Sequence, residues 1–112
     1  MDIKFEKDPV PIITVNGEVD YNNADRLNSV VKKACESRSC IFDLTETTYL
    51  DSAGVQSIFL AIQLNREDDG QVIAVINNKN ISRVIEISAG ELPNFKIVSS
   101  LNEAKKELGI EE

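Results

Sequence analysis

The side chains with the most chemical potential stand together in one short segment, residues 49–54, which reads Tyr-Leu-Asp-Ser-Ala-Gly. The segment follows an apolar run at 40–44 and leads into a helical pattern over 53–66. Ser52 is therefore expected at the start of a helix, where unpaired backbone N–H groups and the positive end of the helix dipole lie. The simplest role for Ser52 there is an N-cap, worth about 1 kcal/mol, with Asp51 as the alternative cap.

Three features of this segment suggest a role beyond capping. Because Asp51 and Ser52 could each cap the helix, one of the two side chains is spare. Gly54 costs a helix about 1 kcal/mol relative to Ala, which indicates close approach by another backbone. The helix is also apolar on both sides, and the pair Leu60 and Leu64, unless another helix covers it, forms the kind of patch that marks a binding surface. The expected inward residues are Val55, Ile58, Phe59 and Ile62, and the expected outward residues are Ala53, Ser57, Leu60 and Leu64.

No catalytic or metal-binding residues are predicted. The chain contains no His, so a serine hydrolase would lack its usual base, and neither a Gly-x-Ser-x-Gly motif nor a motif for a lysine base is present. Asp20, Asp43 and Asp51 could form a magnesium-dependent phosphoacceptor site, but the first strands lack the paired acidic residues of receiver domains. Cys35 and Cys40 match no zinc pattern and are interpreted as reduced, small apolar residues. Because no glycine-rich phosphate loop occurs either, we expect no cofactor.

Length and composition predict one domain over residues 1–112, because domains usually hold roughly 100–150 residues. Twelve basic and 19 acidic residues give a net charge of −7, which repels nucleic acid and anionic lipid, so neither is an expected partner. The N-terminus has neither the basic start nor the long apolar run of a signal peptide or membrane span. The cytoplasm is therefore the expected location.

Apolar periodicity predicts an α/β fold with the element order ββαβαβαβα. It would form a mixed, mainly parallel sheet of about five strands with four helices. Asn16-Gly17 should end the second strand, the segment Asn22-Asn23-Ala24-Asp25 should start the first helix with an Asx cap, and Ser100 with Glu103 should form a capping box on the last one. Partner sites in such folds gather at the carboxyl ends of strands. The expected strands are 2–7, 10–15, 40–44, 72–76 and 96–98, the expected helices are 24–34, 53–66, 81–88 and 101–108, and the carboxyl ends carry 17–22, 45–54 and 77–80.

Five motifs follow one another along nearly the whole chain. They are Gly-Glu-Val-Asp at 17–20 with Asn23, Ala24 and Leu27 after it, Ile-Phe-Asp-Leu at 41–44, the segment at 49–55, Gly-Gln-Val at 70–72, and Ser-Arg-Val-Ile-Glu-Ile-Ser-Ala-Gly at 82–90. In this order they resemble the STAS domain family, especially the bacterial anti-sigma factor antagonists of the SpoIIAA and RsbV type. Two positions depart from the family pattern: Ala53 stands where many members have Ser or Thr, and Gln56 where many have Gly. Ala53 leaves Ser52 as the single hydroxyl of the motif, and Gln56 bears on the identity of the partner.

The resemblance implies a STAS (SpoIIAA-like) fold and the function of an anti-sigma factor antagonist rather than an enzyme. The chain would bind an anti-sigma factor that is also a serine kinase, thereby free a sigma factor, and be switched off when the kinase phosphorylates Ser52. A phosphatase of the PP2C type is implied as a further partner. The phosphosite neighbours would be Asp20, Asp51, Ala53 and Gly54, and the partner-binding residues would be Asn22, Asn23, Gln56, Ser57, Leu60 and Leu64. The alternative is a phosphorylation-silent STAS scaffold or subunit of a stress-signalling or transport complex, in which Ser52 is only a cap.

Overall fold

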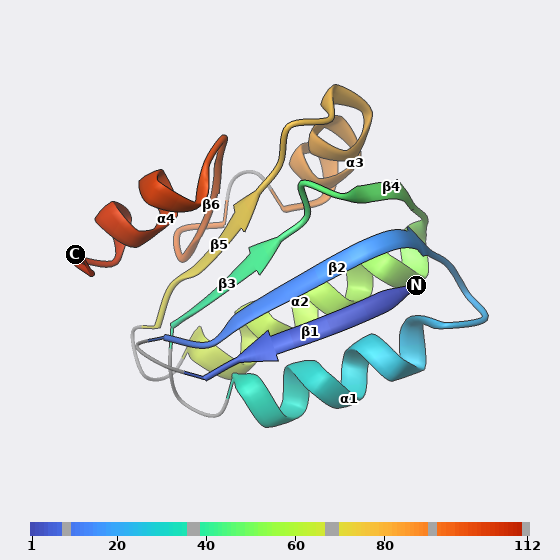
Figure 1. Cartoon of the computed structure of the whole chain (residues 1–112), viewed down its shortest axis with the longest axis horizontal. Coiled ribbons are helices and arrows are strands. Elements are labelled where there is room, and N and C mark those ends of the chain that lie inside the picture. The colour runs from blue at the N-terminus through green and yellow to red at the C-terminus, as the bar shows by residue number, and fades with distance from the viewer. Residues whose placement is uncertain (8–9, 36–38, 67–69, 90–91, 111–112) are drawn as a thin grey trace.

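Six strands and four helices alternate in a computed structural model, which describes residues 1–7, 10–35, 39–66, 70–89 and 92–110 (Figure 1). The predicted α/β class and every predicted element are confirmed, and the structure adds one strand, β4. In chain order the elements are β1 (Asp2–Glu6), β2 (Ile12–Val19), α1 (Ala24–Ala34), β3 (Cys40–Asp43), β4 (Thr47–Leu50), α2 (Ser52–Arg66), β5 (Val72–Val75), α3 (Lys79–Ala89), β6 (Phe95–Val98) and α4 (Leu101–Glu107).

The strands form a mixed sheet whose neighbours are parallel except at one edge. The order across the sheet is β1-β2-β3-β5-β6, in which β1 is antiparallel to β2 and the other pairs are parallel. On the side away from β1, the long strand β2 pairs with two strands in turn, through residues 12–14 with β3 and through residues 17–19 with β4. Since parallel strands end at the same edge of a sheet, the loops that follow β2, β4 and β5 gather at one end of the molecule.

The second strand runs past its predicted end. Asn16-Gly17 was expected to stop it, but β2 continues to Val19. Gly17 has a φ of 93°, which residues with side chains rarely adopt, and the register with β4 shifts at this point. Gly17 therefore bends the strand instead of ending it. The Thr47 hydroxyl holds β4 against the bend by donating to the carbonyl oxygen of Val15 at 2.8 Å.

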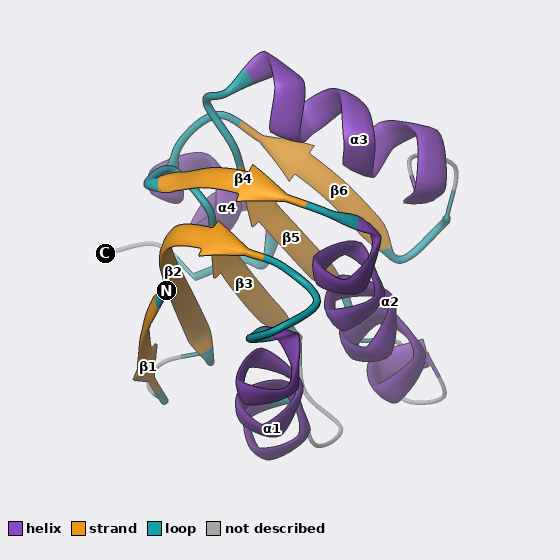
Figure 2. Ribbon diagram, turned by 90° about the vertical axis from the view of Figure 1, so that its right-hand side faces the viewer, coloured by secondary structure: helices purple, strands orange, loops and turns teal. Residues whose placement is uncertain are grey.

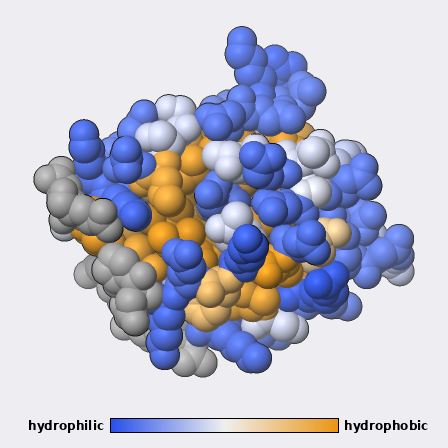
Figure 3. Space-filling view, in the orientation of Figure 1, coloured by the Kyte–Doolittle hydropathy of each residue, from blue (hydrophilic) through white to orange (hydrophobic). Residues whose placement is uncertain are grey.

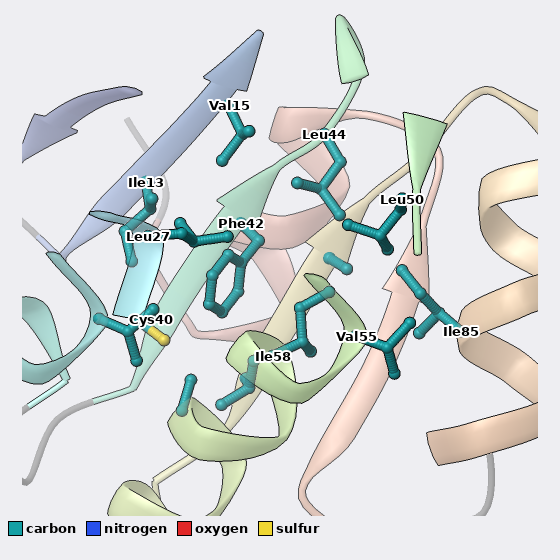
Figure 4. Packing of buried hydrophobic residues seen from close by; sticks show 14 of the residues in the cluster. Ile13, Val15, Leu27, Cys40, Phe42, Leu44, Leu50, Val55, Ile58 and Ile85 are labelled. Atoms are coloured by element: carbon teal, nitrogen blue, oxygen red, sulfur yellow. The ribbon is translucent and has the colours of Figure 1, made fainter. Parts of the chain in front are cut away.

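Different helices cover the two faces of the sheet (Figure 2). Along each strand the side chains alternate, so that Phe42 and Ala74 join the core under α1 and α2, whereas Ile41 and Ile73 join a smaller cluster under α4. Figure 4 shows Phe42 and its neighbours packed between the sheet and α2. On the face turned to the viewer in Figures 1 and 3, apolar residues cross the middle of the surface between hydrophilic side chains.

Two cysteines lie where the chain passes from α1 to β3. Cys35 and Cys40 are both buried and free, with their Sγ atoms 2.9 Å apart in a hydrogen bond. The hydrogen bond with Cys35 and burial in the core raise the pKa of the Cys40 thiol well above its ordinary value. Their burial agrees with the interpretation of both residues as small and apolar.

Candidate functional site

Asp51, not Ser52, caps the second helix. Asp51 follows β4 directly, and its Oδ1 accepts hydrogen bonds from the backbone N–H groups of Ala53 at 3.0 Å and Gly54 at 3.2 Å. Ser52 is the first residue of α2. The prediction that Ser52 caps the helix is therefore wrong, and the alternative cap, Asp51, is confirmed. A carboxylate at this position satisfies two of the free N–H groups that every helix start leaves open.

The Ser52 hydroxyl is therefore not needed to cap the helix. Ser52 is exposed, and within the described residues no hydrogen bond of its hydroxyl is found. It projects from the first turn of a 15-residue helix, where the helix dipole favours added negative charge. A hydroxyl in this place is available to an incoming reagent without loss of a hydrogen bond to the described part of the chain.

Asp51 also joins a second loop to the start of α2. Its Oδ2 accepts a hydrogen bond from the backbone N–H of Tyr21 at 3.0 Å, across 30 positions of sequence. Tyr21 belongs to the turn between β2 and α1 and is 83 % exposed. This hydrogen bond places residues 20–23 next to Ser52. Figure 2 shows this loop reaching toward the first turn of α2.

Asp20 and Asn23 lock that turn onto itself. Asp20 Oδ1 accepts from the backbone N–H groups of Asn22 at 2.9 Å and Asn23 at 3.2 Å, while Asn23 Oδ1 accepts from the N–H of Asp20 at 2.9 Å. Asn23 stands at the N-cap of α1, but its side chain makes no capping bond, so the expected Asx cap is wrong. Instead its amide donates to the carbonyl oxygen of Glu18 at 2.9 Å. The turn therefore presents Asp20, Tyr21 and Asn22 in one fixed arrangement.

Position 54 needs a glycine because neighbouring side chains, and not another backbone, leave no room for a Cβ. A Cβ on Gly54 would collide with the side chain of Leu50 and lie 3.0 Å from Cγ1 of Val19. Both neighbours are buried in the core. A close approach to Gly54 was expected and exists, but side chains make it. The prediction that another backbone makes it is wrong. The absence of a side chain lets the first turn of α2 settle onto the ends of β2 and β4.

The two faces predicted for α2 are only partly as expected. Val55, Ile58 and Ile62 are buried, but Phe59 is only half-buried. On the side expected to face outward, Leu60 is half-buried against the core and Leu64 is exposed.

Ser57 departs furthest from the exposed face expected for it. It has 0 % exposure and donates its hydroxyl to Oδ1 of Asn28 on α1 at 2.6 Å. α1 lies beside α2 and covers this part of the predicted outward face.

A groove opens beside Ser52 between α2, α3 and β4. It has a volume of about 550 Å³. Figure 4 shows Leu50, Val55 and Ile85 directed toward one another from these three elements. Tyr49, Val84 and Ser88 were not among the predicted site residues, and only the apolar residues on the outer side of the predicted third helix could have indicated them. The groove is lined by Tyr49, Leu50, Asp51, Ser52, Val55, Gln56, Phe59, Val84 and Ser88.

The acidic residues near strand ends do not form a metal site. Asp43 Oδ1 accepts from the hydroxyl and N–H of Thr45, and the carboxylates of Asp20 and Asp51 are taken up by backbone N–H groups. Over residues 1–7, 10–35, 39–66, 70–89 and 92–110, no group of three or more His, Cys, Asp or Glu side chains could hold a metal ion. In the same part of the chain, no helix has the length and apolar character needed to cross a bilayer.

Comparison with known proteins extends over almost the whole chain. Residues 3–104 match the model of the STAS domain. An anti-sigma factor antagonist from Mycobacterium paratuberculosis superposes with a TM-score of 0.84 at 20 % identity, covering 96 % of this chain and 93 % of that one. The anti-sigma factor antagonist SpoIIAA in its unphosphorylated form gives 0.74 at 14 % identity, with 96 % and 98 % covered. SpoIIAA of Bacillus in the phosphorylated form gives 0.73 at 17 % identity, with 96 % and 99 % covered. At these identities the likeness establishes a shared fold.

Proposed function

The chain belongs to the STAS domain family, and from this membership we propose that it is an anti-sigma factor antagonist, one domain over residues 1–112, with Ser52 as its phosphorylation site. The observation that carries the proposal is the exposed Ser52 hydroxyl, which bonds to no other described residue because Asp51 caps the helix. The solved structures of similar fold include antagonists in unphosphorylated and phosphorylated forms, which supports the same role here.

In the proposed cycle the unmodified chain docks on an anti-sigma factor that is also a serine kinase, and the sigma factor is released. The chain is the substrate of that kinase in the bacterial cytoplasm and contributes no catalytic group of its own. A phosphatase of the PP2C type restores the hydroxyl. The contact surface includes the turn with Asn22 and Asn23, together with Gln56, Leu60 and Leu64 on α2; Ser57 supports this surface from beneath, through its bond to Asn28.

Phosphorylation would act through charge. A phosphoryl group adds about −1.5 to −2 charges at neutral pH. Within the chain this charge is tolerated, because Ser52 stands at the positive end of α2. At the interface it must be desolvated beside the carboxylates of Asp51 and Asp20. A loss of about 3–4 kcal/mol would weaken binding by about 10²–10³-fold, which suffices for release without refolding.

The rival function is a phosphorylation-silent scaffold. It would use the same surface, and the free hydroxyl of Ser52 would then have no role. The two functions differ in one observable, which is covalent phosphate on Ser52 in the presence of the partner and ATP.

The test uses the partner itself. Immobilised wild-type, Ser52→Ala and Ser52→Asp chains are exposed to lysate of the source cells, and a retained kinase is identified, purified and incubated with the free chain and ATP. We expect one added phosphate at Ser52 and none on Ser52→Ala. Ser29→Ala, which removes an exposed hydroxyl of α1 outside the groove, serves as the matched control and should be phosphorylated like wild type. Phosphate that persists on Ser52→Ala, or a partner that never phosphorylates Ser52, would contradict the proposed switch.

A further inference from the structure

An apolar patch surrounds the groove between α2 and α3. Tyr49 is 50 % exposed, Val84 is 38 % exposed and Ile87 is 81 % exposed. Val84 and Ile87 stand three positions apart on α3 and therefore lie on the same side of that helix. Single exposed apolar residues are ordinary on a surface, but a cluster around a hollow is typical of an interaction site.

The groove is continuous with the phosphorylation site proposed above. Asp51, Ser52 and Gln56 line it together with the apolar side chains of Val55, Phe59 and Val84. A partner that reaches the Ser52 hydroxyl therefore also covers the mouth of the groove. Stable interfaces bury roughly 800 Å² on each partner, an area much larger than one serine, so the neighbouring groove falls inside such a footprint.

The charges around the groove indicate the kind of surface that fits it. Asp51 lines it, Asp20 stands in the turn tied to Asp51, and Glu86 is exposed on α3. Arg83 and Lys79 supply positive charge on the same helix, but the whole chain carries a net charge of −7. Complementary potentials favour association, so the facing surface should be basic.

We infer that the groove receives an apolar side chain of the same partner that docks on Ser52, presented by a surface of net positive charge. The inference rests on the proposed function, because it assigns the groove to that partner. A second copy of this chain is a poorer occupant, since two acidic surfaces would face each other. An apolar anchor in a desolvated pocket contributes more to affinity than the polar rim around it.

The test compares two apolar residues of matched exposure. Val84→Gln replaces one apolar side chain of the groove with a polar one without changing charge. Phe5→Gln does the same on β1, at the edge of the sheet far from α3 in Figure 1, where Phe5 is 40 % exposed. A partner captured from source-cell lysate by immobilised Ser52→Ala is identified and purified, and its Kd for each unphosphorylated chain is measured by calorimetry. Thermal melts of both variants verify folding.

We expect Val84→Gln to raise the Kd at least about fivefold and Phe5→Gln to change it less than about twofold. The Kd should also rise with added salt, as a basic partner surface requires. A Kd that Val84→Gln leaves unchanged overturns the groove assignment even if Ser52 is phosphorylated normally. A large effect of Val84→Gln on a partner that does not phosphorylate Ser52 keeps the groove and rejects the proposed function.

Three other outcomes would also overturn the groove assignment. The first is that the purified wild-type chain self-associates through the groove and Val84→Gln makes it monomeric, as light scattering would show. The second is that native mass spectrometry finds a small apolar molecule bound to wild type and lost in Val84→Gln. The third is that no partner prefers wild type over Val84→Gln.

Discussion

Replacing Asp51 and Ser52 one at a time tests which of the two holds the start of α2. Asp51→Ala removes two capping bonds and the bond to Tyr21 N–H. The lost cap is worth about 1–2 kcal/mol, and the partly exposed third bond adds about 0.5–1 kcal/mol. Ser52→Ala removes an exposed hydroxyl that bonds to none of the residues the structure describes, and it should stay within about 0.5 kcal/mol of wild type.

These free energies correspond to clearly separated melting temperatures. With an unfolding entropy of about 2.1 cal/mol/K per residue, 112 residues give roughly 235 cal/mol/K. Asp51→Ala should therefore lower the Tm by roughly 6–13 °C, and Ser52→Ala should shift it by no more than about 2 °C. Scanning calorimetry on both variants measures the difference. Asp51→Asn is the matched control, because its single amide oxygen can keep the cap but not also the bond to the Tyr21 N–H, so only the capping part of the lost stability should return.

Two results would refute this reasoning. If Ser52→Ala lost as much stability as Asp51→Ala, then Ser52 would be the working cap and its hydroxyl would not be spare. If Asp51→Ala had the same Tm as wild type, the hydrogen bonds of Asp51 that join the two loops would contribute nothing to stability in solution. Either result would remove the observation on which the proposed phosphorylation site depends.

Ser57→Ala should lower the free energy of unfolding by about 1 kcal/mol, because it removes the hydrogen bond to Asn28 that joins α1 and α2. Urea denaturation measures the change, and an unchanged denaturation midpoint would mean that this bond adds nothing to stability. Gly54→Ala should destabilise the chain in the same assay. Overpacking against Leu50 costs about 1–3 kcal/mol, which outweighs the gain in helix propensity of about 1 kcal/mol. Net stabilisation would show that the core relaxes freely around the added methyl group. Cys40 should resist alkylation in the native state. Its raised pKa means that the unfolded chain releases this proton first as the pH rises, so the stability it contributes is complete below the pKa of the unfolded thiol and declines above it. The decline of stability with rising pH should be weaker in Cys40→Ala. Equal slopes of unfolding free energy against pH for the two chains would contradict the raised pKa of Cys40.

The order of elements could be predicted because it depends on local periodicity. Apolar runs such as β5, buried at all four positions, and the stripe of α1 are visible in the sequence alone. The Ser100 cap of α4 was predicted for the same reason, and its Oγ accepts from the N–H of Glu103 at 3.1 Å. β4 was missed because its burial pattern, with Thr47 and Leu50 buried around two exposed residues, does not alternate as a strand should.

The sequence by itself determined the type and order of the elements, and the motif that contains Ser52, since these depend on residues close together along the chain. The tertiary structure decided what those residues do. Asp51 became the cap because its carboxylate reaches both its own helix and Tyr21, thirty positions away. Ser57 became buried because α1 lies against α2. The groove exists because α3, far along the chain, packs beside the start of α2, and no local pattern records a contact that chain crossovers create.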